Sequence, residues 1–120
     1  MPDEFTKVAR QEINDELEKH SKILQSCKND DDVIKNSSEI EKQLHKIKGL
    51  APMMGQQQIG EIASINDSLI KKIIDGNKIA GIFETMNKSH QLMKELMSDS
   101  SKDVSEFLKN IKNTHSEFLK

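Results

Sequence analysis

The chain has 120 residues, which fits one domain built around a single hydrophobic core. Its 18 basic and 20 acidic side chains are spread along the sequence and give a net charge of -2, which argues against a nucleic-acid surface, because such surfaces need clustered positive charge. Hydrophobic residues make up 34% of the chain, with four Phe and neither Trp nor Tyr, so we expect a core of Ile, Leu, Met and Val, a mixture that favours helices.

Apolar residues recur at helical spacing in five segments, which predict helices over 4–28, 32–53, 57–75, 78–97 and 102–119. In the first segment, the spacing places Phe5 and Val8 on the same face as Ile13 and Leu17. The second begins after the capping residues NDDD, and its buried positions run in steps of four and three from Ile40 to Ala51. In the last segment, His115 falls on the apolar stripe.

The connections between these segments are short, and no linker rich in Pro, Gly or Ser divides them. Short connections favour antiparallel neighbours. We therefore expect an all-α protein, with one domain over 1–120 that forms an antiparallel four-helix bundle with an appended fifth C-terminal helix.

The sequence also predicts where the protein works. No apolar run approaches the roughly 20 residues needed to span a bilayer, and MPDEFTKVAR lacks the apolar segment of a signal peptide. A single Cys27 cannot form an intramolecular disulfide. We expect a soluble cytoplasmic protein, a monomer in isolation, that binds neither nucleic acid nor membrane.

The stretch LHKIKGLAPMMG, residues 44–55, contains the strongest candidate site. The helical stripe centred near Leu44 leaves His45 outside the core face, at the solvent boundary. Lys48 lies one turn along, and Gly49, at i+4, removes the side chain that would otherwise stand beside the imidazole. Because glycine inside a helix costs roughly 1 kcal/mol relative to alanine, its position suggests that something large approaches closely.

The chemistry compatible with this arrangement is phosphoryl transfer. Imidazole is largely neutral at cytoplasmic pH, which leaves one ring nitrogen free to attack phosphorus. Lys48 can offset negative charge on the phosphoryl oxygens. The chain has no phosphate-cradling glycine loop and no obvious carboxylate cluster for Mg2+, so we expect no bound cofactor or metal, and ATP and Mg2+ would come with a partner.

His45, Lys48, Gly49, Ala51 and Gly55 form the pattern H-x-x-K-G-x-A-x-x-x-G. This pattern resembles the phosphorylation motif of histidine-containing phosphotransfer (HPt) domains, above all the N-terminal domain of CheA-type chemotaxis histidine kinases. The resemblance implies that a kinase ATP-binding domain phosphorylates His45, which then passes the phosphoryl group to an aspartate of a response-regulator receiver domain. The donor could also be the receiver aspartate of a hybrid kinase.

The same resemblance assigns roles to further residues. Lys48 matches the lysine of the motif, and Gly49 matches its close-approach glycine. Apart from the resemblance, we expect Gly55, Lys42 and Lys46 to serve, with Gly49, partner approach and motif geometry. CheA-type domains place an acidic residue on the third helix to orient the imidazole, and the matching residue is Asp67. Helical rise puts His45 roughly 12 Å and Asp67 roughly 15 Å from the turn between their helices, so the two lie at similar heights.

Two other readings stay open. An HPt-like bundle could act as a binding adaptor that is never phosphorylated, and a plain helical scaffold would be preferred if His45 proved buried. The remaining histidines lack this context, and we expect His20 and His90 at the core boundary and none of them as a metal ligand.

Overall fold

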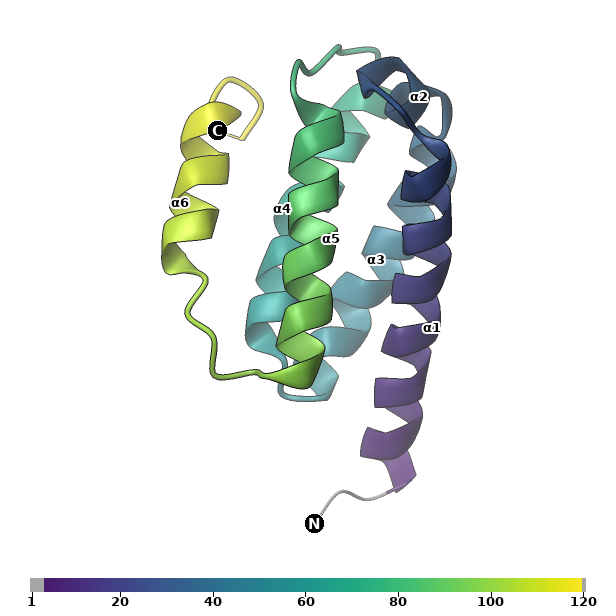
Figure 1. The fold of residues 1–120 in the computed structure, drawn as a ribbon, viewed down its shortest axis with the longest axis vertical. Helices are drawn as coiled ribbons and strands as arrows, with labels where there is room; N and C mark the ends of the chain where they lie inside the picture. The colour runs from purple at the N-terminus through teal and green to yellow at the C-terminus, as the bar shows by residue number, and fades with distance from the viewer. Residues whose placement is uncertain (1–3, 120) are drawn as a thin grey trace.

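The structure, a computed structural model, describes residues 4–119, and within that range it contains six helices and no strand (Figure 1). The helices are α1 (Glu4–Ser26), α2 (Asp30–Lys35), α3 (Ser37–Met53), α4 (Gln57–Ile74), α5 (Ile82–Ser98) and α6 (Ser105–Thr114). The predicted all-α class is therefore confirmed. None of these helices combines the length and the apolar character needed to cross a membrane.

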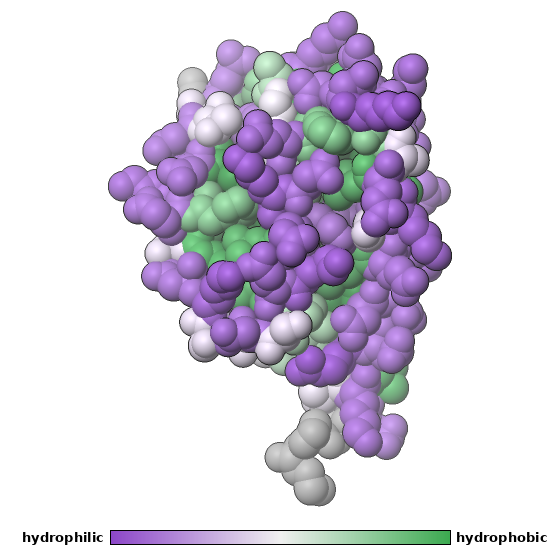
Figure 2. Space-filling model, viewed as in Figure 1, coloured by the Kyte–Doolittle hydropathy of each residue, from purple (hydrophilic) through white to green (hydrophobic). Residues whose placement is uncertain are grey.

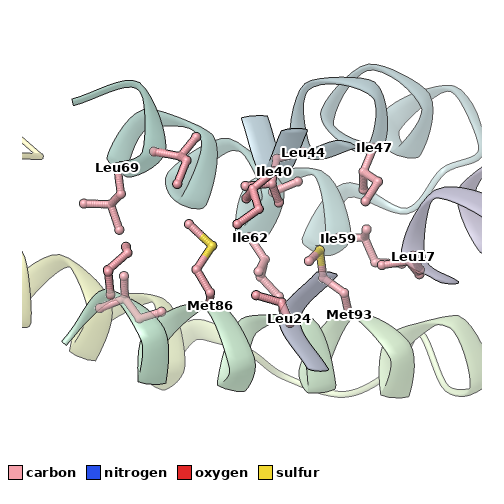
Figure 3. Close-up of a cluster of buried hydrophobic side chains, with 14 of the residues drawn as sticks. Leu17, Leu24, Ile40, Leu44, Ile47, Ile59, Ile62, Leu69, Met86 and Met93 are labelled. Carbon is pink, nitrogen blue, oxygen red and sulfur yellow. The ribbon is translucent and has the colours of Figure 1, made fainter. Parts of the chain in front are cut away.

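The four long helices contact one another in a closed ring. α3 packs against α1 and α4, and α5 packs against α4 and α1. Each large apolar side chain buried in the interior stabilises the fold by about 1.5–3 kcal/mol. Figure 3 shows these side chains meeting between the helices, and the labelled ones are Leu17, Leu24, Ile40, Leu44, Ile47, Ile59, Ile62, Leu69, Met86 and Met93.

The predicted helix over 32–53 is divided at Asn36 into α2 and α3. The Asn36 side chain donates to the backbone carbonyl of Asp32 (2.8 Å) and approaches Cys27 Sγ (3.8 Å). Asparagine side chains compete in this way with the regular helical pattern. At the start of α2, the Asn29 side chain accepts from the backbone N–H of Asp32, as expected for an N-cap.

The helix predicted over 78–97 corresponds to α5, which begins at Ile82 rather than at residue 78. The Asp30 carboxylate accepts the backbone N–H groups of Gly81 (3.0 Å) and Phe83 (2.8 Å), so a side chain from α2 caps this helix across the fold. Gly81 has a φ of 85°, a left-handed conformation that other residues rarely adopt. A cap supplied by a residue about fifty positions away has no local sequence signal.

The helix α6 is shorter than the predicted 102–119. Before it, the Asp103 carboxylate accepts the backbone N–H of Ser105 (3.0 Å), which favours a turn at the helix start. α6 lies at the edge of the molecule and buries Leu108 and Ile111 (Figure 1). Figure 2 shows a largely hydrophilic face with hydrophobic side chains visible between α5 and α6, where a groove is lined in part by Phe107 and Ile111.

The first turns of α1 differ from the sequence expectation. Phe5 and Val8 are 55% and 52% exposed, although their spacing placed them on the buried face. In Figure 1 this end of α1 extends beyond the other helices. The apolar periodicity therefore continues into turns that no other helix within residues 4–119 covers.

Candidate functional site

His45 lies on the solvent side of α3. Leu44 and Ile47, its neighbours on the helix, are fully buried, whereas the His45 side chain is 66% exposed. The packing of the apolar side of α3 sets the rotation of the helix and therefore turns the imidazole outward. This is the orientation that the periodicity predicts, and the buried His45 that would have favoured the scaffold reading is not observed.

Asp67 lies on α4, opposite His45, and is 1% exposed. The two helices approach closely at their connected ends, because a Cβ on Gly60 would lie only 3.3 Å from Pro52 Cγ. Asp67 Oδ2 is 3.9 Å from His45 Nδ1. This separation exceeds a hydrogen bond but brings the carboxylate and the ring into electrostatic contact.

Two lysines share the Asp67 carboxylate. Lys48 Nζ and Lys71 Nζ lie 3.5 Å and 3.1 Å from Oδ2. Their positive charges offset the cost of burying the carboxylate, which would otherwise be several kcal/mol. Sequence reasoning found Lys48 but missed Lys71, although Lys71 stands four residues after Asp67 on the same helix, the spacing at which opposite charges meet.

Glu41 is a second acidic residue that sequence reasoning missed. Its Oε2 lies 3.8 Å from His45 Nδ1, and its side chain is 22% exposed. The pKa of Glu41 is raised chiefly because the adjacent Asp67 carboxylate would accept a hydrogen bond from a protonated Glu41; burial and repulsion between the two carboxylates act in the same direction. The i−4 spacing from His45 was the available signal.

Both carboxylates therefore face the Nδ1 side of the His45 ring. One donor atom from each of Glu41, His45 and Asp67 lies within 4.8 Å of the others. The site combines an accessible imidazole ring, two acidic groups and two ammonium groups on α3 and α4.

The other predicted residues surround this centre without joining it. Lys46 points to the opposite side, where its Nζ lies 3.4 Å from the buried Glu16 carboxylate of α1. Lys42 is exposed on α3. A Cβ added to Gly49 would meet nothing within 4 Å, so this exposed glycine leaves the surface near the imidazole open. Gly55 has a φ of 77° and forms the turn after α3.

A shallow groove lies beside the site along the α3–α4 seam. It is lined by Lys48, Pro52, Gln57, Gly60, Glu61 and Ser64. Because Lys48 contributes both to the groove and to the contact with Asp67, an approaching protein surface would meet the groove and the site together.

The sequence predicts His20 and His90 at the core boundary, and this prediction is wrong. Both residues are buried, with 0% and 7% of their surface exposed. Their rings meet edge to face at a centroid distance of 5.2 Å, and His20 Nδ1 lies 3.1 Å from Gln43 Oε1. Burial lowers the pKa of each to about 4. Helical spacing alone gave no sign that α1 and α5 would bring these two rings together.

His115 is buried at the end of α6, on the apolar stripe that predicted it. Its Nε2 lies 2.7 Å from Thr85 Oγ1 of α5. Burial lowers its pKa, with the negative charge of Asp30 acting in the opposite direction. Of the four histidines, only His45 joins wide exposure to a charged environment.

Comparisons with known proteins identify no relative: no family model, no curated protein and no solved structure matches the chain.

Proposed function

We propose that this chain is a histidine phosphotransfer domain of two-component or chemotaxis signalling, similar to the phosphoacceptor domain of CheA-type kinases. His45 accepts a phosphoryl group from an ATP-dependent kinase domain and passes it to an aspartate of a response-regulator receiver domain. The observation that carries the proposal is a widely exposed imidazole whose Nδ1 side faces two carboxylates, beside two lysines.

The packing of the helices supports the same proposal. The closed ring of α1, α3, α4 and α5 suits an antiparallel four-helix bundle, with α6 as the appended helix. Such a bundle presents a phosphoacceptor on the outside of a rigid helix, where two different proteins can reach it in turn. The domain would work as a monomer in the cytoplasm.

The proposed reaction divides the two ring nitrogens between two roles. Nε2 attacks the γ-phosphorus of ATP held by the kinase domain, a P–N bond forms, and the P–O bond to ADP breaks. Nδ1 carries a proton on the side of Glu41 and Asp67, whose negative charge stabilises the developing positive charge of the ring. In the second step, a receiver carboxylate oxygen attacks phosphorus and the P–N bond breaks.

Lys48 and Lys71 supply the positive charge near the transferred group. Their side chains are about half exposed, and their ammonium groups contact Asp67. A phosphoryl group on His45 would offer them a second anionic partner. The nucleotide and Mg2+ belong to the kinase domain in this scheme.

Phosphate incorporation tests the proposal directly. The protein and its His45→Gln variant are incubated with a chemotaxis-type kinase catalytic domain, ATP and Mg2+, and the label is examined for acid lability and stability in base. We expect label in the parent protein only, and onward transfer when a receiver domain is added. Circular dichroism shows whether both proteins carry the same helix content.

The adaptor is the alternative function, and the groove along the α3–α4 seam is the observation that favours it. It predicts that a receiver domain binds the parent protein and the His45→Gln variant equally well. A folded sample that takes no label from several kinases, yet binds the receiver, would support the adaptor over phosphotransfer.

A further inference from the structure

We propose that Glu41, His45 and Asp67 also form a binding site for a divalent transition-metal cation of the Zn2+ type. The three residues present one imidazole nitrogen and two carboxylate oxygens, all within 4.8 Å of one another. Three ligands of these types with a fourth position open to water are typical of accessible zinc sites.

The distances are close to those of a metal centre. His45 Nδ1 is 3.8 Å from Glu41 Oε2 and 3.9 Å from Asp67 Oδ2. In a tetrahedral site with bonds of about 2.0–2.2 Å, the ligand atoms lie about 3.3–3.6 Å apart. The two separations from His45 Nδ1 therefore exceed those of a tetrahedral site by only about half an ångström. Glu41 and His45 stand one turn apart on α3, and Asp67 comes from α4, so two helices hold the three ligands.

A second observation points to a ligand at this position. Asp67 is 1% exposed, and its Oδ1 has no hydrogen-bond partner among the described residues. A buried polar atom without a partner destabilises the fold, and more so when it is charged. A cation bound by both oxygens of this carboxylate would remove that cost, and it would also relieve the repulsion between Asp67 and Glu41.

The two lysines compete with the cation for the Asp67 carboxylate, so their ammonium groups must move away before the cation binds. Lys48 and Lys71 contact Asp67 Oδ2, and their side chains are 40% and 51% exposed. Both ammonium groups sit on flexible stems that can turn into solvent. The Asp67 carboxylate can therefore pair either with the two ammonium groups or with the metal cation. Removal of one lysine should favour binding of the metal.

The donor set selects the kind of ion. Mg2+ and Ca2+ prefer six or more oxygen ligands, whereas an imidazole with carboxylates suits Zn2+ and similar cations. Because the His45 side chain is 66% exposed, solvent can reach the remaining coordination position.

Metal binding would also regulate the site, a consequence that rests on the proposed phosphotransfer function. A cation on Nδ1 occupies the lone pair there and leaves the ring proton on Nε2, which then has no free lone pair with which to attack phosphorus. Zn2+ would then slow phosphorylation of His45. The metal site itself does not depend on that function.

The test is calorimetric titration of the full chain with ZnCl2, without kinase or nucleotide. We expect binding of one equivalent in the parent protein and affinity at least about tenfold lower in Glu41→Gln, since even residues that only orient a ligand contribute about 10–100-fold. Glu39→Gln, an exposed acid on the same helix, is the matched control and should bind as the parent does. Equal binding by parent and Glu41→Gln would overturn the proposal.

Two further measurements locate the metal. Lys71→Gln should bind Zn2+ several-fold more tightly than the parent, whereas Lys72→Gln, the exposed neighbouring lysine, should not. Nitrogen-15 spectra should show the metal-induced shift at His45 Nδ1. Shifts confined to His20, His90 or His115, or no gain of affinity in Lys71→Gln, would contradict the site. None of these readouts changes if His45 is never phosphorylated.

Discussion

Two pairs of helices in this protein hold histidines in opposite ways. At the α3–α4 seam, His45 is exposed among two carboxylates and two ammonium groups. Between α1 and α5, His20 and His90 are buried against each other, and three of their ring nitrogens lack a hydrogen-bond partner among the described residues. The comparison shows that the same side chain becomes a candidate nucleophile or a neutral core residue according to the helix face that carries it.

The largest expected effect separates two adjacent residues of α3. Leu44→Ala should lower the free energy of unfolding by about 2–5 kcal/mol, because it leaves a cavity in the core. His45→Gln should change it by less than about 0.5 kcal/mol, because the site is exposed. Urea unfolding of both variants measures the difference, and comparable losses would refute the assignment of the two faces.

The buried pair should make stability depend on pH. Each folded-state pKa, about 4, lies below the ordinary 6.5, so the unfolded chain takes up protons first as the pH falls. The stabilisation is complete above about pH 6.5 and is lost as the pH falls toward about 4, with a slope of at most about 1.4 kcal/mol per pH unit for each histidine.

His90→Leu sharpens this prediction by removing one of the two rings. Its free energy of unfolding should fall less steeply than that of the parent between pH 6.5 and pH 5, while His45→Gln should keep the parent's slope. Urea unfolding at a series of pH values gives both slopes. Identical slopes in the parent and His90→Leu would mean that the buried pair does not control acid stability.

Asp67→Asn tests whether the buried carboxylate orients the exposed ring. If Asp67 positions the imidazole, its loss should slow the labelling of His45 by about 10–100-fold, the usual effect of removing a group that orients a histidine. The nitrogen-15 shifts of His45 should also report a different ring tautomer. A normal labelling rate with unchanged shifts would remove Asp67 from the site.

Lys48→Ala should have the smallest effect of this series. Because the ammonium group is partly exposed, its loss should slow phosphoryl transfer only up to about fivefold, corresponding to about 1 kcal/mol or less. Lys72→Ala provides a control for general loss of positive charge. The transfer rates of the parent and Lys48→Ala should become more similar at high salt, since salt screens an exposed charge. Equal losses of rate in Lys48→Ala and Lys72→Ala would argue against a specific role for Lys48.

Sequence reasoning located the helices well where packing follows a local period. The stripe from Ile40 to Ala51 is buried as expected, and so is the stripe from Ile59 to Ile73. It failed where a distant contact decides the outcome. Asp30 caps α5 although about fifty residues separate the two in the sequence. Phe5 lies on the predicted face of α1, but in the first turns, which no neighbouring helix within residues 4–119 covers.

The candidate site shows the same division. The sequence indicated that His45 stands outside the core, and helical rise placed Asp67 at a similar height. Glu41 and Lys71 escaped notice because each looks like an ordinary surface charge until α3 and α4 are packed together. His20 and His90 were missed because the rotation of α1 against α5 determines their burial.

By itself, the sequence determined the all-α class, most of the buried faces and the outward direction of His45, since these depend on residues three or four positions apart on one helix. Only the tertiary structure decided which charges surround the imidazole and which histidines lie in the core. Those outcomes depend on the relative rotation and spacing of separate helices, which the packing of the whole core determines.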